Sequence, residues 1–306
     1  MVGPPFTEKA AYGPNHLHFP SSPSFLREKS RLFPTEIPEN TLMRSDSVGQ
    51  LAMLVVAPHP DDAEIFCGGL ILRTCSLGYK VGVLDLSQAE LSTLGTVAQR
   101  QAETARASEM LGLTWRDNLD LPNCNFHEYS CPEHGTDQNA AVRATVKTLR
   151  TVRPEVLVIP YHSDRHPDHV QAGKLLQRSL FLAGLLNFRE ADLPPFTPKL
   201  VLLYQFRSLQ TPSFIVDISE YVEQKYAVIG CYASQFSHDP DRPSTLLSSA
   251  LSLTSLRARD TQLGAYIGTA AGEGYLTTAM TRIDDPIQHS RNNPTDAALF
   301  FSEHRN

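Results

Sequence analysis

The sequence predicts an α/β fold, a Rossmann-like and mostly parallel sheet with helices on both faces. Short apolar runs alternate along the chain with segments of helical apolar spacing, which is the pattern of successive βα units. The first of these runs, residues 51–57, is apolar throughout, as expected of a strand buried on both faces. Polar clusters follow two of these runs directly, where the carboxyl ends of parallel strands form a binding crevice.

The first fifty residues form a separate region by composition. They contain seven prolines, which exclude long helices and central strands. We therefore expect an extension over residues 1–50 and the folded domain over 51–306. Several aromatic residues favour contact of the extension with the domain or a neighbouring subunit, and a disordered leader is the alternative.

The domain begins with two βα units. Residues 51–57 are an apolar run, and 64–77 follow with helical spacing and Gly78 as a stop signal. The run 80–86 predicts the second strand, and 97–111, rich in Ala, Gln, Glu and Arg and closed by Gly112, the second helix.

The later elements follow the same alternation. Residues 121–137 appear irregular, 139–152 predict a helix and 155–160 a strand, followed by a helix over 170–186. Further strands are expected at 200–204 and 214–218, and helices at 220–230 and 246–268. The glycine-rich stretch 272–275 is expected to be a loop.

The amino-acid composition limits the classes of molecule that the chain is expected to bind. The net charge of -6 and the pI near 6.0 give no basic surface for nucleic acid or anionic membrane, which favours a small substrate. Five cysteines are an odd number at low density, which indicates reduced thiols in a cytoplasm. No apolar run approaches the ~18 residues of a membrane helix, and no secretory signal is recognisable.

The first polar cluster is Pro58–Glu64, directly after the first predicted strand. Its residues His59, Asp61 and Asp62 are ligand types that suit zinc or a similar divalent ion. The alternative is that the acids only cap the following helix. One acid is enough for capping, so two acids beside a histidine favour a metal site.

The second cluster is Asp164–His169, after the strand at 155–160. Pro167 suits the first helical position, and His166 and His169 are three residues apart, on one helix face. A polar helix start with two surface histidines is the alternative. A catalytic zinc site takes three protein ligands, so His59, one of the two aspartates and one of these histidines would leave a carboxylate and an imidazole for proton transfer. The spacing thus predicts metal-assisted hydrolysis without specifying the bond.

Residues 58–64 and 164–169 together resemble the motifs of the zinc-dependent LmbE-like, or PIG-L-type, N-acetylglucosamine deacetylases. Residues 211–218 and 231–236 look most like the bacillithiol-pathway branch, the N-acetylglucosaminyl-malate deacetylases. The resemblance covers about 51–275. It implies a Rossmann-like fold, hydrolysis of an acetamide, a sugar substrate and a homo-oligomer.

The resemblance also implies roles for single residues. One Zn²⁺, or another divalent ion, would be bound by His59, Asp62 and His169. Asp61 would be the general base, His166 the oxyanion stabiliser and general acid, and Asp168 the residue that orients His166. The resemblance implies a substrate contact by Arg165 and closure of the pocket by a tyrosine, either Tyr204 or Tyr232. We also expect substrate contacts from Glu90 and from Glu64, although the first-turn position of Glu64 equally suits a role in complementing the helix dipole.

One departure concerns the substrate. Leu94 stands where the branch usually has an arginine expected to contact substrate, so a cation that could pair with malate is lost. The alternatives are a different N-acyl sugar or glycoside without malate carboxylates, or a sugar-binding protein that retains the metal without activity. A nucleotide-binding domain is excluded because no G-x-G-x-x-G follows the first strand.

A separate set of metal-ligand types lies in the irregular segment. Cys124, His127, Cys131 and His134 could hold a second, structural zinc, although their spacing is not that of a standard finger.

Overall fold

The structure is a computed structural model. It describes residues 49–126, 140–206, 210–237, 241, 243–249, 251–277, 279–280 and 282–292. The extension expected over 1–50 therefore lies almost entirely outside the described residues. No described helix has both the length and the apolar character to cross a membrane.

The described chain forms a seven-stranded sheet in the order β3-β2-β1-β4-β5-β7-β6. Parallel pairs join the strands from β3 to β5, whereas β7 runs antiparallel to both β5 and β6. The strands are β1 (Met53–Ala57), β2 (Val81–Asp85), β3 (Trp115–Asn118), β4 (Val156–Pro160), β5 (Leu200–Tyr204), β6 (Phe214–Asp217) and β7 (Gly272–Leu276). The predicted Rossmann-like sheet is confirmed, and its strand order reverses between β1 and β4, where such folds bind ligands.

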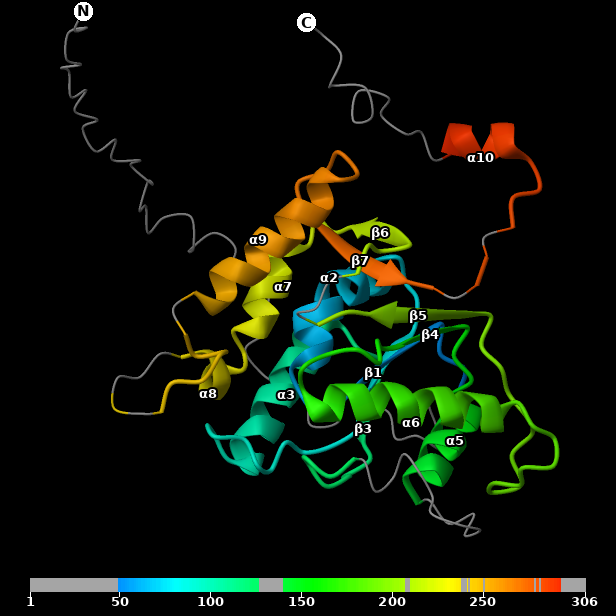
Figure 1. Ribbon diagram of the computed structural model, residues 1–306, viewed down its shortest axis with the longest axis horizontal. Helices are drawn as coiled ribbons and strands as arrows, with labels where there is room; N and C mark the ends of the chain where they lie inside the picture. Colours follow the sequence, from blue (N-terminus) through cyan, green and yellow to red (C-terminus); the bar gives the residue numbers. More distant parts are fainter. Residues whose placement is uncertain are drawn as a thin grey trace, which may run out of the picture. The chain divides into compact units, whose positions relative to one another are not determined.

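Helices cover both faces of this sheet, as predicted. The helix α5 (Ala140–Val152) and α6 (Pro167–Ala183) pack on one face, and α2 (Asp62–Ser76), α3 (Val97–Leu111) and α7 (Val222–Ile229) on the other. Figure 1 shows α5 and α6 across the sheet from α2 and α7. The remaining described helices are α8 (Ala233–Phe236), α9 (Ser252–Ala265) and α10 (Pro286–Asn292).

The central strand β1 explains the two-sided core. Every residue of β1 is buried, and Leu54 and Val56 join the cluster under α5 and α6. Met53, Val55 and Ala57 join the cluster under α2 and α3. Successive side chains of a strand point to opposite faces, so an all-apolar run is needed to fill both layers. Full burial of each larger side chain contributes about 1.5–3 kcal/mol.

Two strands differ from the sequence prediction. Residues 272–275, expected to be a loop, belong to β7, and β3 was not predicted at all. Glycine is depleted in strands, but a Cβ at Gly272 would lie 2.5 Å from the Ile215 side chain, so close packing between β6 and β7 requires glycine there. The helix expected over 246–268 is also shorter, since α9 covers Ser252–Ala265.

Candidate active site

The two polar clusters meet at the carboxyl ends of β1 and β4, on either side of the point where the strand order reverses. Together they line one cavity of about 310 Å³, at the small end of the range for small-molecule sites. The loop after β1 is held by the end of β2, because the Ser87 hydroxyl donates to the Pro58 carbonyl at 3.0 Å. The sheet topology thus brings together residues that are a hundred positions apart in sequence.

Three side chains of the predicted metal set lie close together. The Asp62 Oδ2 atom is 3.1 Å from His59 Nδ1 and 3.4 Å from His169 Nε2, and one donor atom from each residue lies within 4.8 Å of the others. Zinc–ligand bonds of 2.0–2.1 Å in tetrahedral geometry place donors about 3.3 Å apart. The spacing therefore suits a single divalent ion.

Neighbouring groups orient these candidate ligands. Asp164 Oδ1 lies 3.2 Å from His169 Nδ1, which leaves His169 Nε2 facing Asp62. His59 Nε2 lies 3.1 Å from both Asp168 Oδ2 and Asn123 Oδ1. Burial disfavours the charged His59 ring, but hydrogen bonds to Asp168 and Asp62 outweigh it and raise the pKa of His59 to about 10. Carboxylates at this distance commonly fix the ring orientation of metal-binding histidines.

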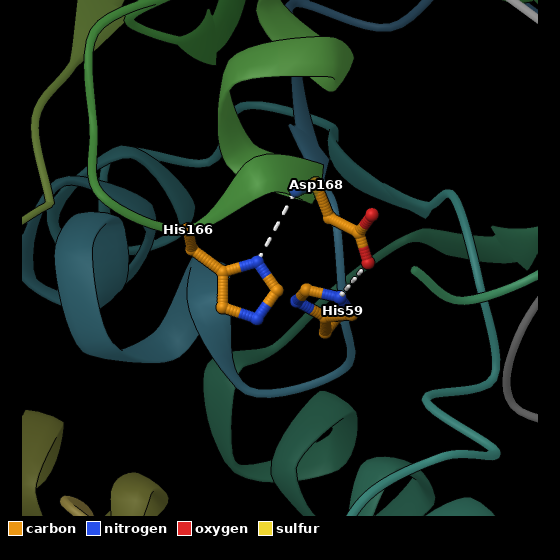
Figure 2. Close-up of side chains that lie close together, drawn as sticks. All are labelled: His59, His166 and Asp168. Atoms are coloured by element: carbon orange, nitrogen blue, oxygen red, sulfur yellow. Dashed lines mark hydrogen bonds and ion pairs between the residues drawn. The ribbon is translucent and has the colours of Figure 1, made fainter. Parts of the chain in front are cut away.

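His166 is oriented by a main-chain group rather than by a carboxylate. It is the N-cap of α6, and its Nδ1 accepts the Asp168 N–H at 3.2 Å. Figure 2 shows this bond, with the Asp168 carboxylate turned to His59 instead. The expected orienting role of Asp168 thus falls to its backbone, because the carboxylate is bonded to His59 and to the Cys124 N–H at 2.8 Å.

The acceptor role of Nδ1 places the proton of a neutral His166 ring on Nε2. Burial lowers the pKa of His166, and the neighbouring His169 and His59 rings lower it further. The His166 and His169 rings are stacked, with centroids 4.6 Å apart. A neutral ring with a proton on Nε2 can donate a hydrogen bond to a developing negative charge.

Asp61 is held in an unusual backbone conformation beside a buried cation. Its φ of 120° is rare for a residue other than glycine, and such outliers concentrate at functional sites. Its Oδ2 accepts from Arg100 Nη1 at 2.9 Å, and the same nitrogen donates to the Pro60 carbonyl. Burial raises the pKa of Asp61 and Arg100 opposes it, leaving a value of about 7. A carboxylate with a pKa near neutrality is suited to general-base catalysis.

Glu64 lies beneath the cavity rather than in it. Its side chain is fully buried, and its Oε1 accepts from Arg116 at 2.6 Å and from the Tyr232 hydroxyl at 2.8 Å. Arg116 also pairs with Asp85 at 2.8 Å. We therefore expect no direct contact between Glu64 and the substrate. Its bonds to Arg116 and Tyr232 instead stabilise the start of α2, which follows the first polar cluster.

Neither candidate tyrosine closes the cavity. Tyr232 is fully buried in the Glu64 network, and Tyr204 is fully buried with its hydroxyl donating to the Val56 carbonyl at 3.1 Å. Both hydroxyls satisfy buried acceptors of the domain. The expectation that one of them covers the substrate is wrong for this structure.

The other predicted contacts have mixed positions. Arg165 is exposed and lines the cavity. Glu90 does not line it and instead accepts the Asn123 N–H at 2.7 Å, so its effect on the site is indirect. Leu94 is buried and does not line the cavity. Of the possible second zinc set, Cys124 lies at the cavity edge, whereas His127, Cys131 and His134 lie outside the described residues.

Three residues of the site were not identified from the sequence. Arg100 lies in α3 without any motif, and Asn123 lies in a stretch read only as irregular. Asp164 stands within the second motif but carried no assigned role. Each acts through tertiary contacts that chain position does not reveal: with Asp61, His59 and His169, respectively.

Comparison with known proteins identifies the family. The PIG-L family profile, described as GlcNAc-PI de-N-acetylase, matches residues 54–180. A diacetylchitobiose deacetylase from Thermococcus kodakarensis is 31% identical over an alignment of 199 residues, which covers 61% of this chain and 71% of that protein. The segment matched by the family profile, residues 54–180, includes both polar clusters.

Two further relatives agree in fold or sequence. A 1D-myo-inositol 2-acetamido-2-deoxy-alpha-D-glucopyranoside deacetylase from Catenulispora acidiphila is 26% identical, covering 78% of this chain and 93% of that protein. The solved structure of an N,N'-diacetylchitobiose deacetylase from Pyrococcus horikoshii matches with a TM-score of 0.62 and 25% identity, covering 73% of this chain and 82% of that one. The expected closeness to the bacillithiol branch is not confirmed by these relatives, which are named for other sugar substrates.

Proposed function

The chain belongs to the PIG-L family of de-N-acetylases, and from that premise we propose that it is a zinc-dependent hydrolase that removes acetyl from an N-acetylglucosamine conjugate. The observation that carries the proposal is the meeting of His59, Asp62 and His169 with a separate carboxylate and imidazole in one cavity. This arrangement provides both a metal site and the groups that move protons.

The residues present fit a zinc ion. Two imidazoles and one carboxylate are a donor set that zinc prefers, and three protein ligands leave a coordination position open for catalysis. Asp164 and Asp168, which contact the outer nitrogens of the two histidines, would hold the rings in place. A divalent ion bound there would polarise the acetyl carbonyl and lower the pKa of the attacking water.

The remaining groups divide the proton transfers. Asp61 takes a proton from the attacking water as the water oxygen bonds to the acetyl carbon. The neutral His166 ring stabilises the negative charge on the carbonyl oxygen through its Nε2–H. The proton that Asp61 took from the water goes to the leaving nitrogen as the C–N bond breaks, which returns both side chains to their starting protonation states. The products are acetate and the free amine. Arg100 holds Asp61 in place through its 2.9 Å ion pair.

The proposed substrates share the 2-acetamido sugar and differ in the group attached to it. The relatives act on chitobiose and inositol conjugates by their names, and the resemblance of 211–218 and 231–236 adds the malate conjugate as a candidate. The acetamide is the group that the site handles chemically, so the attached group affects binding more than the reaction.

The test is acetate release from N-acetylglucosamine conjugates by the purified protein, with and without zinc. We expect zinc-dependent release that is lost in Asp61→Asn and reduced at least about 100-fold in His166→Gln. Asp192→Asn, an exposed carboxylate in the loop after α6, is the matched control and should keep full activity. No acetate from any conjugate at any zinc concentration would rule out the proposal.

A sugar-binding protein that retains the metal is the rival function. It predicts saturable binding of the same conjugates with intact metal and no acetate even after long incubation. The Asp61–Arg100 pair favours an enzyme over a sugar-binding protein, because a buried carboxylate whose pKa lies near neutrality is suited to proton transfer.

A further inference from the structure

The cavity has an apolar outer part that the deacetylation chemistry does not use. We propose that this part binds an apolar aglycone, so that the substrate is an N-acetylglucosaminide of an alkyl or aryl group rather than of malate. The inference rests on the proposed function, since it concerns the substrate of the same site. It starts from the side chains that surround the polar cluster.

Apolar side chains reach the cavity from four segments. They come from α2, from the loop after β2, from the end of β5 and from the segment before α9: Ile65, Phe66, Leu91, Phe206, Leu246 and Leu247. Polar side chains of the same cavity come from the two motifs and from other segments, among them Ser92, Thr93, Gln235 and Thr245. The part of the cavity around Leu91, Leu246 and Leu247 therefore combines apolar side chains with uncharged hydroxyl and amide groups, which suits an uncharged group with hydrocarbon surface.

Two of these leucines are exposed. Leu91 is 65% and Leu246 is 42% accessible, and both lie in turns whose backbone does not require an apolar residue. Scattered exposed leucines are ordinary, but apolar side chains grouped at the mouth of a functional cavity indicate a binding surface. Binding of an apolar group here would remove both side chains from water.

The charges of the cavity argue against malate. Among the described residues, the arginines lining it are Arg100 and Arg165. Arg100 is buried and engaged by Asp61 and the Pro60 carbonyl. A malate group carries two carboxylates, and of the arginines in the described lining only Arg165 is exposed and able to pair with them. An uncharged aglycone leaves no carboxylate unpaired.

The experiment compares three substrates with zinc-loaded protein: the methyl and octyl glycosides of N-acetylglucosamine, and N-acetylglucosaminyl-malate. Acetate release gives kcat/KM for each. Burial of each methylene improves transition-state binding by about threefold, so we expect the octyl glycoside to exceed the methyl glycoside by at least about tenfold. The malate conjugate should not exceed the methyl glycoside.

The variants locate the effect. Leu91→Ser and Leu246→Ser should each lower kcat/KM for the octyl glycoside by about threefold to tenfold and affect the methyl glycoside less, because it has no alkyl chain to contact them. The matched control is Leu77→Ser, which is also 65% exposed but lies at the end of α2 outside the cavity. It should change neither substrate. Size-exclusion chromatography of all three variants shows whether the leucines instead hold two copies together.

The outcomes are distinct. Equal kcat/KM for methyl and octyl glycosides, or a faster malate conjugate, overturns the apolar aglycone while deacetylation stands. Leucine variants that dissociate an oligomer without changing selectivity assign the surface to a second copy and also overturn it. Absence of acetate from all three substrates refutes the proposed function itself, and the inference falls with it.

Discussion

Replacement of Asp61 by asparagine tests whether the buried Asp61 carboxylate, which the proposed reaction needs, lowers the free energy of unfolding. The Asp61 pKa rises from 3.8 to about 7 in the folded chain, chiefly through burial and against the pull of Arg100. A folded pKa above the unfolded one means that the folded state binds the proton more tightly. Stability is therefore lost as pH rises from about 4 to about 7, and the loss is complete above that range.

The magnitude follows from the two pKa values. A tenfold change in proton affinity is worth about 1.4 kcal/mol, so the ionised Asp61 costs the metal-free protein about 4 kcal/mol at pH 8 and about 1 kcal/mol at pH 4.5. Asparagine keeps the shape and an acceptor for Arg100 without the charge. We expect Asp61→Asn to be more stable than the parent by up to these amounts, and inactive.

The assay is urea unfolding of the metal-free proteins at the two pH values, with EDTA present, followed by circular dichroism. The gain should be large at pH 8 and small at pH 4.5. Asp192→Asn, which removes an exposed carboxylate, should change stability by less than about 0.5 kcal/mol at either pH. An Asp61→Asn variant that is less stable at pH 8 would refute the reasoning, because the ion pair with Arg100 would then outweigh burial.

Three further predictions concern the residues around the site. Arg116→Met should lower the free energy of unfolding by about 3–5 kcal/mol, because it leaves buried Asp85 and Glu64 without their cation. Arg143→Met removes a partly exposed pair with Glu190 and should cost at most about 1 kcal/mol; equal losses in urea unfolding would contradict this. Tyr232→Phe should lower the free energy of unfolding by about 1–3 kcal/mol, because it removes the hydroxyl that donates to Glu64. Its kcat/KM should be nearly unchanged. A large fall in kcat/KM without a loss of stability would show that Tyr232 contacts the substrate after all. Gly173→Ala places a Cβ 2.9 Å from the His162 Cα and 3.0 Å from the Pro160 carbonyl, so it should shift α6 and His169, cost about 1–3 kcal/mol and weaken zinc affinity in calorimetry. Unchanged zinc affinity would show that α6 can accommodate the added Cβ without moving His169.

Much of the fold could be predicted because its signals are local. β1 and β4 are continuous apolar runs, and α3 carries a capping box at Thr96 and a left-handed Gly112 at its end. β3 could not be found because its sequence, Trp-Arg-Asp-Asn, has little strand propensity and depends on pairing with β2. β7 was taken for a loop because its glycines are explained only by packing against β6.

The site was predictable where chemistry is concentrated in a motif. His59 and Asp62 stand in one motif and His166 and His169 in another, each at the carboxyl end of a predicted strand, and the pairing of β1 with β4 brings the two motifs to one crevice. Arg100 and Asn123 could not be found because they reach the site from other βα units. The contacts of Asp168 could not be assigned to single atoms, because the sequence does not distinguish its backbone N–H, which contacts His166, from its carboxylate, which contacts His59.

The most direct test of the account is the position of the metal in a zinc-loaded crystal, located by anomalous scattering. Among the residues that the structure describes, two groups of side chains could hold an ion, and they share His59: one is completed by Asp62 and His169, the other by His166 and Asp168. We expect a zinc ion bound by His59, Asp62 and His169, with the His166 Nε2–H free to donate a hydrogen bond to the carbonyl oxygen. Zinc bound to His166 and Asp168 in the active protein would contradict this expectation.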